Sequence, residues 1–271
     1  MKHVLWILIV SLASTACKKD DKPTTNPVPP PKKGWLKDIS YSNLPSPYYH
    51  FEYNSDGRVQ KISFSDAMAQ YNVAYETNGI SHIEKTNADN HDKLVYTYQE
   101  AGKPIYIEYT RFTGEVYQRC FITYNAQGQI INMEWETKIN GVGFMQLREL
   151  TFSYYSDGNL KDLNGHGFAI DGVQEEYTYT EHYENYDSNL NTDDFTLYQT
   201  NNDHTLLLPG IRIQQNNPGK VTRSGGPFSF EITYAYTCQN KYPVSRNGFM
   251  KITSGPDAGK EFFIAAGYTY Y

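Results

Sequence analysis

The sequence predicts an all-β fold: an antiparallel meander of repeated hairpins that forms a large twisted sheet or a closed barrel, with at most one or two short helices. Three observations predict this fold class. The chain of 271 residues contains 25 tyrosines, and aromatic residues favour strands. Apolar and polar residues alternate over many short segments, which is the period of a half-buried strand. Glycines recur between these segments, where a positive φ closes a hairpin.

A glycine-centred repeat runs through residues 51–163. A tyrosine stands four residues before each glycine, and an apolar or aromatic residue stands six before it. Successive glycines are 22, 23, 26 and 30 residues apart. Four of them are followed five residues later by another apolar residue, whereas the turn at Gly79 is predicted to be one residue shorter. The glycines are Gly57, Gly79, Gly102, Gly128 and Gly158, and the tyrosines are Tyr53, Tyr75, Tyr98, Tyr124 and Tyr154.

The first unit shows the physical meaning of the repeat. Phe51 and Tyr53 flank Glu52, so the two aromatic rings share one face of a strand. Residues 54–57 have the composition of a turn, and residues 58–64 form the predicted returning strand. A single hairpin is marginally stable in water, so successive hairpins must pair to bury their aromatic face. The repeat therefore predicts a meander with its tyrosines in the core.

The second half of the chain is less regular but is also predicted to be strands. Residues 177–183 and 228–236 alternate between apolar and polar side chains, and residues 261–270 complete the sheet. Tyr236 precedes Asn240 by four, which predicts a sixth hairpin. Residues 193–197 begin with two aspartates and are a candidate for a short helix, because acidic residues favour the first helical turn.

The first 16 residues are predicted to be a signal peptide. Residues 4–10 are apolar and residues 11–16 are mostly small. This apolar run is too short to span a bilayer. The sequence Ser-Thr-Ala-Cys at 14–17 resembles a bacterial lipobox, although Ser14 replaces the usual Leu. The resemblance implies cleavage before Cys17 and a diacylglycerol on its sulfur. The alternative is an ordinary signal peptide followed by an incidental cysteine.

Residues 17–33 are predicted to form a lipidated tether. Lys-Lys-Asp-Asp at 18–21 resembles the export signal of Bacteroidetes-type surface lipoproteins, which implies exposure on the outer face of the outer membrane. The alternative is a solvated charge cluster. Residues 22–33 are rich in proline and are typical of a semi-rigid spacer. The remaining residues, 34–271, are predicted to be a single β-hairpin-repeat domain, a normal size for one all-β barrel or sandwich.

The repeat motif resembles known architectures. Residues 51–59 (Phe-Glu-Tyr-Asn-Ser-Asp-Gly-Arg-Val) resemble the tyrosine–aspartate repeats of the Rhs family of shell-forming β proteins. Over about residues 35–271, together with the anchor, the chain resembles an uncharacterised family of Bacteroidetes-type lipoproteins described as having a porin-like fold. The resemblance implies architecture and anchoring. It implies no activity, because no catalytic residue is established for that family.

Charge and cysteine content limit the partners. Removing residues 1–16 removes Lys2, which leaves 23 of the 24 basic residues against 30 acidic ones, a net charge of −7. An acidic chain without a basic stripe argues against nucleic acid as a partner. Cys120 and Cys238 are the remaining thiols after Cys17. An exported protein permits a disulfide between them, but both lie in predicted strands, where a free cysteine also packs well.

One segment has the ligand spacing of the first half of a calcium loop. Oxygen-bearing side chains occur at every second position, but the glycine at the sixth place and the glutamate at the twelfth are missing. The alternative is a loop whose Asn and Asp side chains bond their own backbone. The candidate ligands are Asn185, Asp187, Asn189, Asn191 and Asp193.

No catalytic motif or cofactor site is predicted. The histidines lack the spacing of a zinc site, and there is no Gly-x-Ser-x-Gly elbow. Carboxylates on alternating strand positions are interpreted as solvated faces, and Trp135, which shares a face with Met133, is predicted to lie in the core. The candidate carboxylates for glycoside hydrolysis, by residue type alone, are Glu134, Glu136, Glu149, Glu175 and Glu176.

The leading hypothesis is a non-catalytic, outer-membrane-anchored lipoprotein that displays a β-scaffold for binding or for envelope structure, with a glycan or an envelope protein as partner. Two alternatives remain open. The aromatic end of the chain, residues 268–271, resembles the terminal signal of integral outer-membrane barrels, although the strands lack a clear aliphatic band for lipid. A hydrolase acting on polysaccharide would need two carboxylates that face each other in a cleft.

Overall fold

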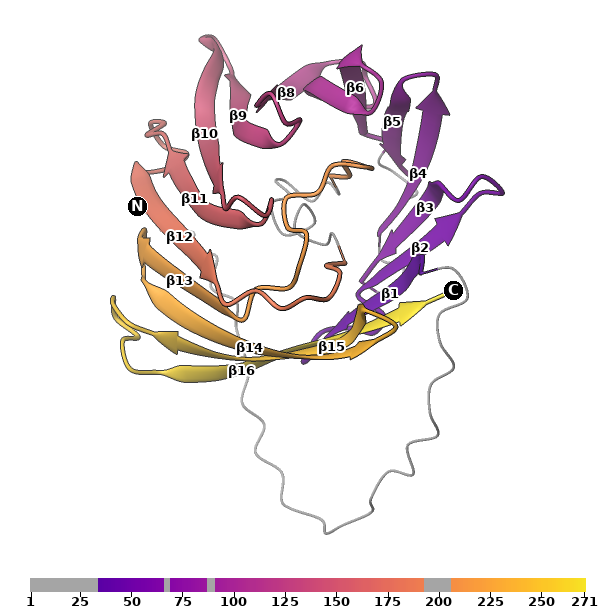
Figure 1. Cartoon of the computed structure of the whole chain (residues 1–271). Helices are drawn as coiled ribbons and strands as arrows, with labels where there is room; N and C mark the ends of the chain where they lie inside the picture. The colour runs from indigo at the N-terminus through magenta and orange to yellow at the C-terminus, as the bar shows by residue number, and fades with distance from the viewer. Residues whose placement is uncertain (1–33, 66–68, 87–90, 193–205) are drawn as a thin grey trace. The chain divides into compact units, whose positions relative to one another are not determined.

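The computed structural model describes residues 34–65, 69–86, 91–192 and 206–271. These residues form sixteen strands in one closed barrel. Each strand pairs antiparallel with its neighbours in the sequence, and the last strand, β16 (Glu261–Tyr270), pairs with the first, β1 (Leu36–Tyr41), to close the ring (Figure 1). The predicted all-β meander is confirmed, and the ring is closed rather than open. The predicted helix start at 193–197 lies outside the described residues.

The described chain is strand throughout, joined by short turns and one long connection. No helix in it is long and apolar enough to cross a membrane. The remaining strands are β2 (Tyr49–Tyr53), β3 (Val59–Phe64), β4 (Ala69–Glu76), β5 (Gly79–Lys85), β6 (Lys93–Glu100), β7 (Lys103–Thr110), β8 (Val116–Tyr124), β9 (Ile130–Ile139), β10 (Gly143–Tyr154), β11 (Leu160–Gly167), β12 (Tyr177–Glu184), β13 (Lys220–Gly225), β14 (Phe230–Gln239) and β15 (Tyr242–Ile252).

The repeat glycines form the predicted turns. At the first, the Gly57 N–H donates to the Asn54 carbonyl at 3.0 Å, and Gly57 has a φ of 80°. The same bond forms at Gly128 and at Gly158. At Gly79 the turn is one residue shorter, as predicted, because Tyr75 pairs with Ile80, five residues on, whereas Tyr53 pairs with Val59, six residues on. Because every glycine closes a hairpin between adjacent strands, the repeat spacing sets the strand order.

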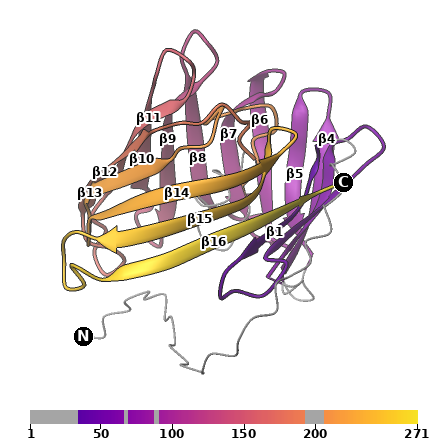
Figure 2. The same cartoon turned by 60° about the horizontal axis from the view of Figure 1, so that its bottom comes forward.

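The two faces of the barrel wall differ in polarity. Phe51, Ile62, Met133 and Trp135 point inward and are at most 4 % exposed, which confirms the predicted place of Trp135 in the core. The residues that alternate with them point outward and are mostly polar. Figure 2 shows the inclined strands that form this wall. The core therefore lies inside the ring, and mostly polar side chains cover the outside, with a few exposed aromatic rings such as Phe249 and Phe263.

The connection between β12 and β13 crosses the inside of the ring (Figure 1). Its described parts, residues 185–192 and 206–219, are called the lumen segment below. Leu206 and Leu208 are 1 % and 6 % exposed. The Tyr96 hydroxyl, which points inward from β6, donates to the Leu207 carbonyl at 3.1 Å. The apolar face of the wall thus packs against chain that fills the interior.

The repeat tyrosines connect one hairpin to the previous one. The Tyr154 hydroxyl donates to the Ile130 carbonyl at 2.6 Å, and Ile130 begins the returning strand of the preceding unit. The same bond recurs around the barrel at 2.7–2.8 Å. It joins Tyr53 to Leu36, Tyr124 to Pro104, Tyr186 to Leu160 and Tyr270 to Pro243. The tyrosine spacing therefore encodes bonds between units, in addition to burial within each unit.

Candidate functional site

The outer face of the wall between β10 and β13 carries two rows of polar side chains. In the first row, Glu149, His166 and Thr178 are cross-strand neighbours. The second row lies two residues along each strand. These side chains line an open hollow of about 410 Å³. The second row consists of Thr151, Asn164, Thr180 and Ser224.

The second row is joined by hydrogen bonds. The Thr180 hydroxyl donates to Asn164 Oδ1 at 2.8 Å, and Asn164 Nδ2 donates to Thr151 Oγ1 at 3.4 Å. Within the described part of the chain, the hydroxyls of Thr178 and Ser224 bond no other side chain and face solvent. The hollow therefore presents one linked row and additional hydroxyls that both donate and accept hydrogen bonds.

The alternation of β12 places these hydroxyls outward. Tyr177 and Tyr179 point inward and lie across Gly167 and Gly165 of β11. A Cβ built on Gly165 would lie 2.2 Å from Tyr179 Cζ, so only a glycine leaves room for the ring. Aromatic rings that cover strand glycines stabilise the register of a sheet. Thr178 and Thr180, which alternate with these tyrosines, are consequently held on the outer face.

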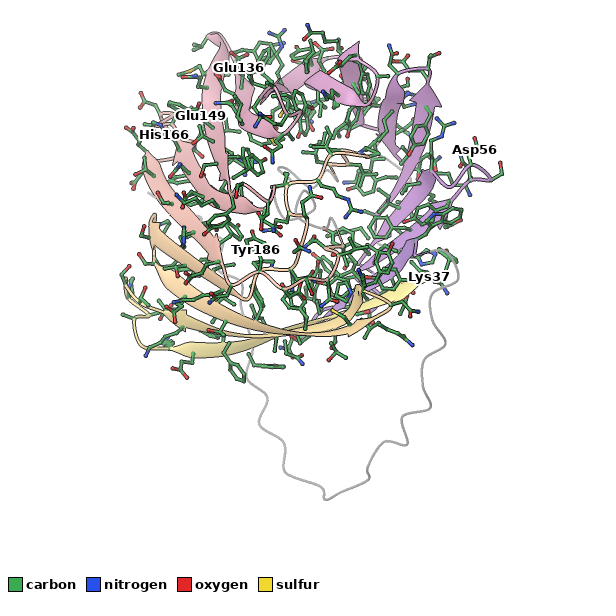
Figure 3. All side chains as sticks on the ribbon, viewed as in Figure 1. Lys37, Asp56, Glu136, Glu149, His166 and Tyr186 are labelled. Atoms are coloured by element: carbon green, nitrogen blue, oxygen red, sulfur yellow. The ribbon has the colours of Figure 1, made fainter. Side chains whose placement is uncertain are left out.

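Glu149 and His166 stand at the edge of the hollow. Asn132 Nδ2 donates to one Glu149 oxygen at 2.5 Å, and His166 Nε2 lies 2.8 Å from a Glu176 oxygen. The His166 ring packs on Phe168 with ring centroids 4.1 Å apart. In Figure 3, Glu149 and His166 lie along the wall, whereas Tyr186 lies within the ring of strands. The edge thus carries a carboxylate and an aromatic pair.

A separate cluster of polar side chains on β10, β11 and β12 lies beside the hollow. His182 Nδ1 is 2.7 Å from Asp162 Oδ1, and the Ser153 hydroxyl donates to Asp162 Oδ2 at 3.0 Å. Burial raises the pKa of Asp162, but the bonds from His182 and Ser153 outweigh it and hold this pKa below its usual value. Asp38 is flanked in the same way on the far side of the ring, by His50 and Thr269. Each of these two clusters therefore joins side chains of three neighbouring strands by hydrogen bonds, which indicates a structural role.

A second hollow, of about 530 Å³, lies at the ends of β8 and β9. Its cations are Arg111 and Lys138. Lys138 Nζ is 2.8 Å from a Glu115 oxygen, and Arg111 lies 4.0 Å from Asp92 and over the Tyr117 ring. Both cations therefore already face a carboxylate, which weakens this hollow as an anion site.

The calcium candidates form a network of their own. Asp187 accepts the backbone N–H and the side-chain amide of Asn189, and it also accepts the amide of Asn217 at 3.1–3.2 Å. Asn191 donates to Asn217. Asn185 has a φ of 59°, and Asp193 lies outside the described residues. Among the residues described, no three His, Cys, Asp or Glu side chains are placed to hold a metal.

The candidate disulfide is absent. Cys120 and Cys238 are both free. Cys120 lies on β8 and Cys238 on β14, with strands β9 to β13 between them in the wall. Burial raises the pKa of both thiols. The sequence could not exclude a bridge, because both positions are strand positions and only the barrel order separates them. Cys17 lies outside the described residues.

The carboxylates chosen by type lie on the outer wall and in the turn before β12. Glu134 and Glu149 are directly opposite on β9 and β10, and Glu134 accepts a bond from Gln146 at 2.6 Å. Glu149 lines the hollow. Sequence reasoning missed the threonines and Asn164 beside it, because cross-strand register decides which side chains meet. The available signal was the alternation of Tyr and Thr along residues 177–180. Glu136 is on β9, and Glu175 and Glu176 precede β12.

Two solved structures share this fold. One is a porin-like protein from Bacteroides uniformis, with 14 % identity and a TM-score of 0.56 over 82 % of this chain and 89 % of that one. The other is a porin-like protein from Bacteroides vulgatus, with 14 % identity and a TM-score of 0.55 over 88 % of this chain and 99 % of that one. No family model and no curated protein matches the sequence. The chain therefore has the barrel fold of these porin-like proteins.

Proposed function

We propose that the chain is an outer-membrane lipoprotein, anchored through Cys17, whose barrel stands in water as a non-catalytic binding scaffold. The observation that carries this proposal is the polarity of the barrel wall. Side chains that face outward form ion pairs and hydrogen bonds between strands, whereas the apolar side chains face inward onto the lumen segment. An aqueous outside and a packed inside fit a barrel held at the end of a tether.

Ion pairs occur on several sides of the outer wall. Lys61 lies 3.4 Å from Glu52 on β2 and β3. Other pairs join β5 to β6 and β13 to its neighbours on both sides, and a hydrogen bond between His50 and Asp38 joins β2 to β1. In an outer-membrane barrel, each Lys or Arg on the lipid face costs about 2–4 kcal/mol near the bilayer midplane. The pairs are Lys93–Glu84, Lys220–Glu184 and Lys220–Glu231.

The integral barrel remains the second candidate, because its support is specific. The two structural relatives are described as porin-like, and the ring is closed, which leaves no free strand edge. Phe249 and Phe263 are also exposed side by side on the outer face, at 64 % and 52 %. These two rings form a local patch. They do not make the continuous apolar band that a lipid-facing wall requires.

Substitution of Cys17 separates the two candidates. In the full chain, Cys17→Ser abolishes lipidation, and the protein is expected to leave the membrane fraction and stay monodisperse without detergent. Wild type and the matched control Cys238→Ser are expected to stay membrane-bound and to incorporate labelled fatty acid. An integral barrel would remain in the membrane in all three cases, and that result would overturn the proposal.

Protease treatment of intact cells tests surface exposure. If Lys18–Asp21 directs the protein outward, wild type is expected to be digested on whole cells. The double substitution of Asp20 and Asp21 by alanine is expected to be protected while remaining lipidated. Equal digestion of both proteins would show that this acidic pair does not direct export.

A further inference from the structure

We propose that the hollow on the outer face of β10–β13 binds a neutral oligosaccharide. This inference deepens the proposed function and rests on it, because the hollow is accessible only if the outer wall faces water. The hollow of about 410 Å³ falls within the range of about 300–1,000 Å³ that is common for small-molecule sites. The hollow is open to solvent and its lining residues extend across four neighbouring strands, which suits a chain of sugar rings laid across the strands.

The hydrogen-bonding groups of the hollow match hydroxyls. The side chains of Thr178 and Ser224 each donate and accept, and Asn164 retains an amide N–H beyond its bond to Thr151. Side chains on neighbouring strands stand about 4.8 Å apart, a spacing on the scale of a pyranose ring. A sugar carries hydroxyls around its ring that both donate and accept hydrogen bonds. It can therefore bond a row of side chains that contains donors as well as acceptors.

The charge of the hollow selects against anions. Glu149 lines it, and Glu134 is directly opposite Glu149 on the next strand. The basic side chain among the lining residues is His166, which already bonds Glu176 at 2.8 Å. A phosphate or uronate placed here would meet carboxylates with no cation left to pair with it. The charge therefore favours a neutral ligand, and among sugars it favours those without acidic groups.

The edge of the hollow supplies the apolar contact that a sugar needs. The His166 ring packs on the Phe168 ring, and this contact holds His166 in one orientation. Aromatic rings present both a flat apolar face and directed edges, and the C–H face of a pyranose can lie against such a ring. Hydroxyl partners along the rows and a ring at one end together orient a sugar chain.

The binding test uses the full chain in a detergent without a sugar headgroup. The probes are maltohexaose, xylohexaose, mannohexaose and chitohexaose, with hexagalacturonate as the anionic counterpart. Saturation-transfer NMR and calorimetry are expected to detect binding of at least one neutral hexamer and none of hexagalacturonate. Failure of all four neutral hexamers, or equal binding of hexagalacturonate, would overturn the inference.

Matched variants locate the binding site. Thr178→Val and Ser224→Ala each remove one of the solvent-facing hydroxyls that line the hollow, and each is expected to weaken binding about three- to tenfold. Thr97→Val, on the outer face of β6, is the control and is expected to bind as wild type does. Unchanged binding by both hollow variants, or equal loss in the control, would show that the sugar binds elsewhere.

Equal melting temperatures are required of all three variants, so that a loss of binding is not a loss of fold. The outcomes also separate this inference from the proposed function. A protein that Cys17→Ser releases into water, but that binds no hexamer, would refute the oligosaccharide site alone. A protein that needs detergent after Cys17→Ser would refute the tethered scaffold first.

Discussion

The tyrosine hydroxyl is the residue-scale feature that explains the composition of this chain. Periodicity alone predicted that the repeat tyrosines face the core, because alternate strand residues share a face. The structure adds a second role. The rings are partly buried on the inner side of the wall, and the hydroxyls of Tyr53, Tyr124 and Tyr154 each donate to a carbonyl of the preceding hairpin, as Tyr154 does to Ile130. Serine or leucine could not perform both roles at one position.

Replacement of Tyr154 by phenylalanine measures this bond. Tyr154→Phe keeps the ring but leaves the Ile130 carbonyl without its donor, so the free energy of unfolding is expected to fall by about 0.5–1.5 kcal/mol. Urea unfolding provides the measurement. Tyr177→Phe is the control, because the Tyr177 ring covers Gly167 and its hydroxyl has no bond to a described residue. An equal loss in both variants would mean that the hydroxyl bond contributes nothing.

The sequence predicted which face of its own strand a side chain occupies. It did not predict which residues far apart in the sequence contact one another. The inward place of Trp135 follows from its alternation with Met133. By contrast, the bond between Tyr96 and Leu207 spans 111 residues, and that between Asp38 and Thr269 spans 231. Such partners depend on strand order and register, which alternation within a strand does not contain.

At the scale of elements, glycines on β11 determine how β12 packs. Gly165 and Gly167 lie beneath the rings of Tyr179 and Tyr177, and this contact turns the threonines of β12 toward the hollow. Arg223 on β13 lies over the Tyr179 ring at 4.2 Å and bonds Glu181, so the ring is confined from a second side. The inner packing of two strands thus fixes the outer surface of the candidate site.

Two glycine substitutions test this packing. Gly165→Ala would place a methyl group 2.2 Å from Tyr179, and overpacking of this kind is expected to destabilise the fold by about 1–3 kcal/mol. Gly267→Ala on β16 is the matched control, because nothing lies within 4 Å of its Cβ position. There a neutral result or a gain of about 0.5–1 kcal/mol is expected. Thermal unfolding compares the two, and equal stability would contradict the proposed confinement of the ring.

The lumen segment provides a test of the calcium hypothesis. Both Asp187 oxygens already accept amide hydrogens from Asn189 and Asn217. A cation at this place would have to displace those bonds, so millimolar calcium is expected to leave the melting temperature unchanged. Magnesium at equal ionic strength is the control. A calcium-specific rise in melting temperature would instead establish a metal site that uses these loop oxygens.

The closed ring is the property of the whole molecule that sequence could not decide. Six hairpins were visible as repeats or as a degenerate copy, which was enough to predict a meander. An open sheet and a barrel contain the same hairpins. They differ only in whether β1 meets β16, a pairing of residues at the two ends of the described chain. Local patterns carry no information about that contact. The hollow at β10–β13 could not be predicted either, because it depends on the register between neighbouring strands.

The partly buried repeat tyrosines predict a sharp alkaline limit. Burial raises the pKa of Tyr75 and Tyr98 to about 12 and raises the pKa of Tyr53, Tyr124 and Tyr154 as well. Unfolded tyrosine ionises near pH 10. The stabilisation is therefore complete below pH 10 and is lost as pH rises toward the folded-state pKa values.

Melting temperature between pH 8 and pH 12, together with tyrosinate absorbance, measures this effect. Stability is expected to be nearly flat up to about pH 10 and then to fall steeply, with ionisation and unfolding occurring together. Gradual ionisation of these tyrosines in a protein that remains folded would contradict the prediction.

The contact between β1 and β16 also governs how the chain acquires its fold. Leu36 pairs with Tyr270, so the ring cannot close until the last strand has left the ribosome and any translocation pore. Pairings of such sequence separation form slowly, because the entropy of loop closure is lost before the contact is gained. Until then the first fifteen strands present two open edges, which invite association with other chains. Closure of this barrel therefore requires both β1 and β16, and a barrel that has not closed is expected to associate with other chains through its open edges.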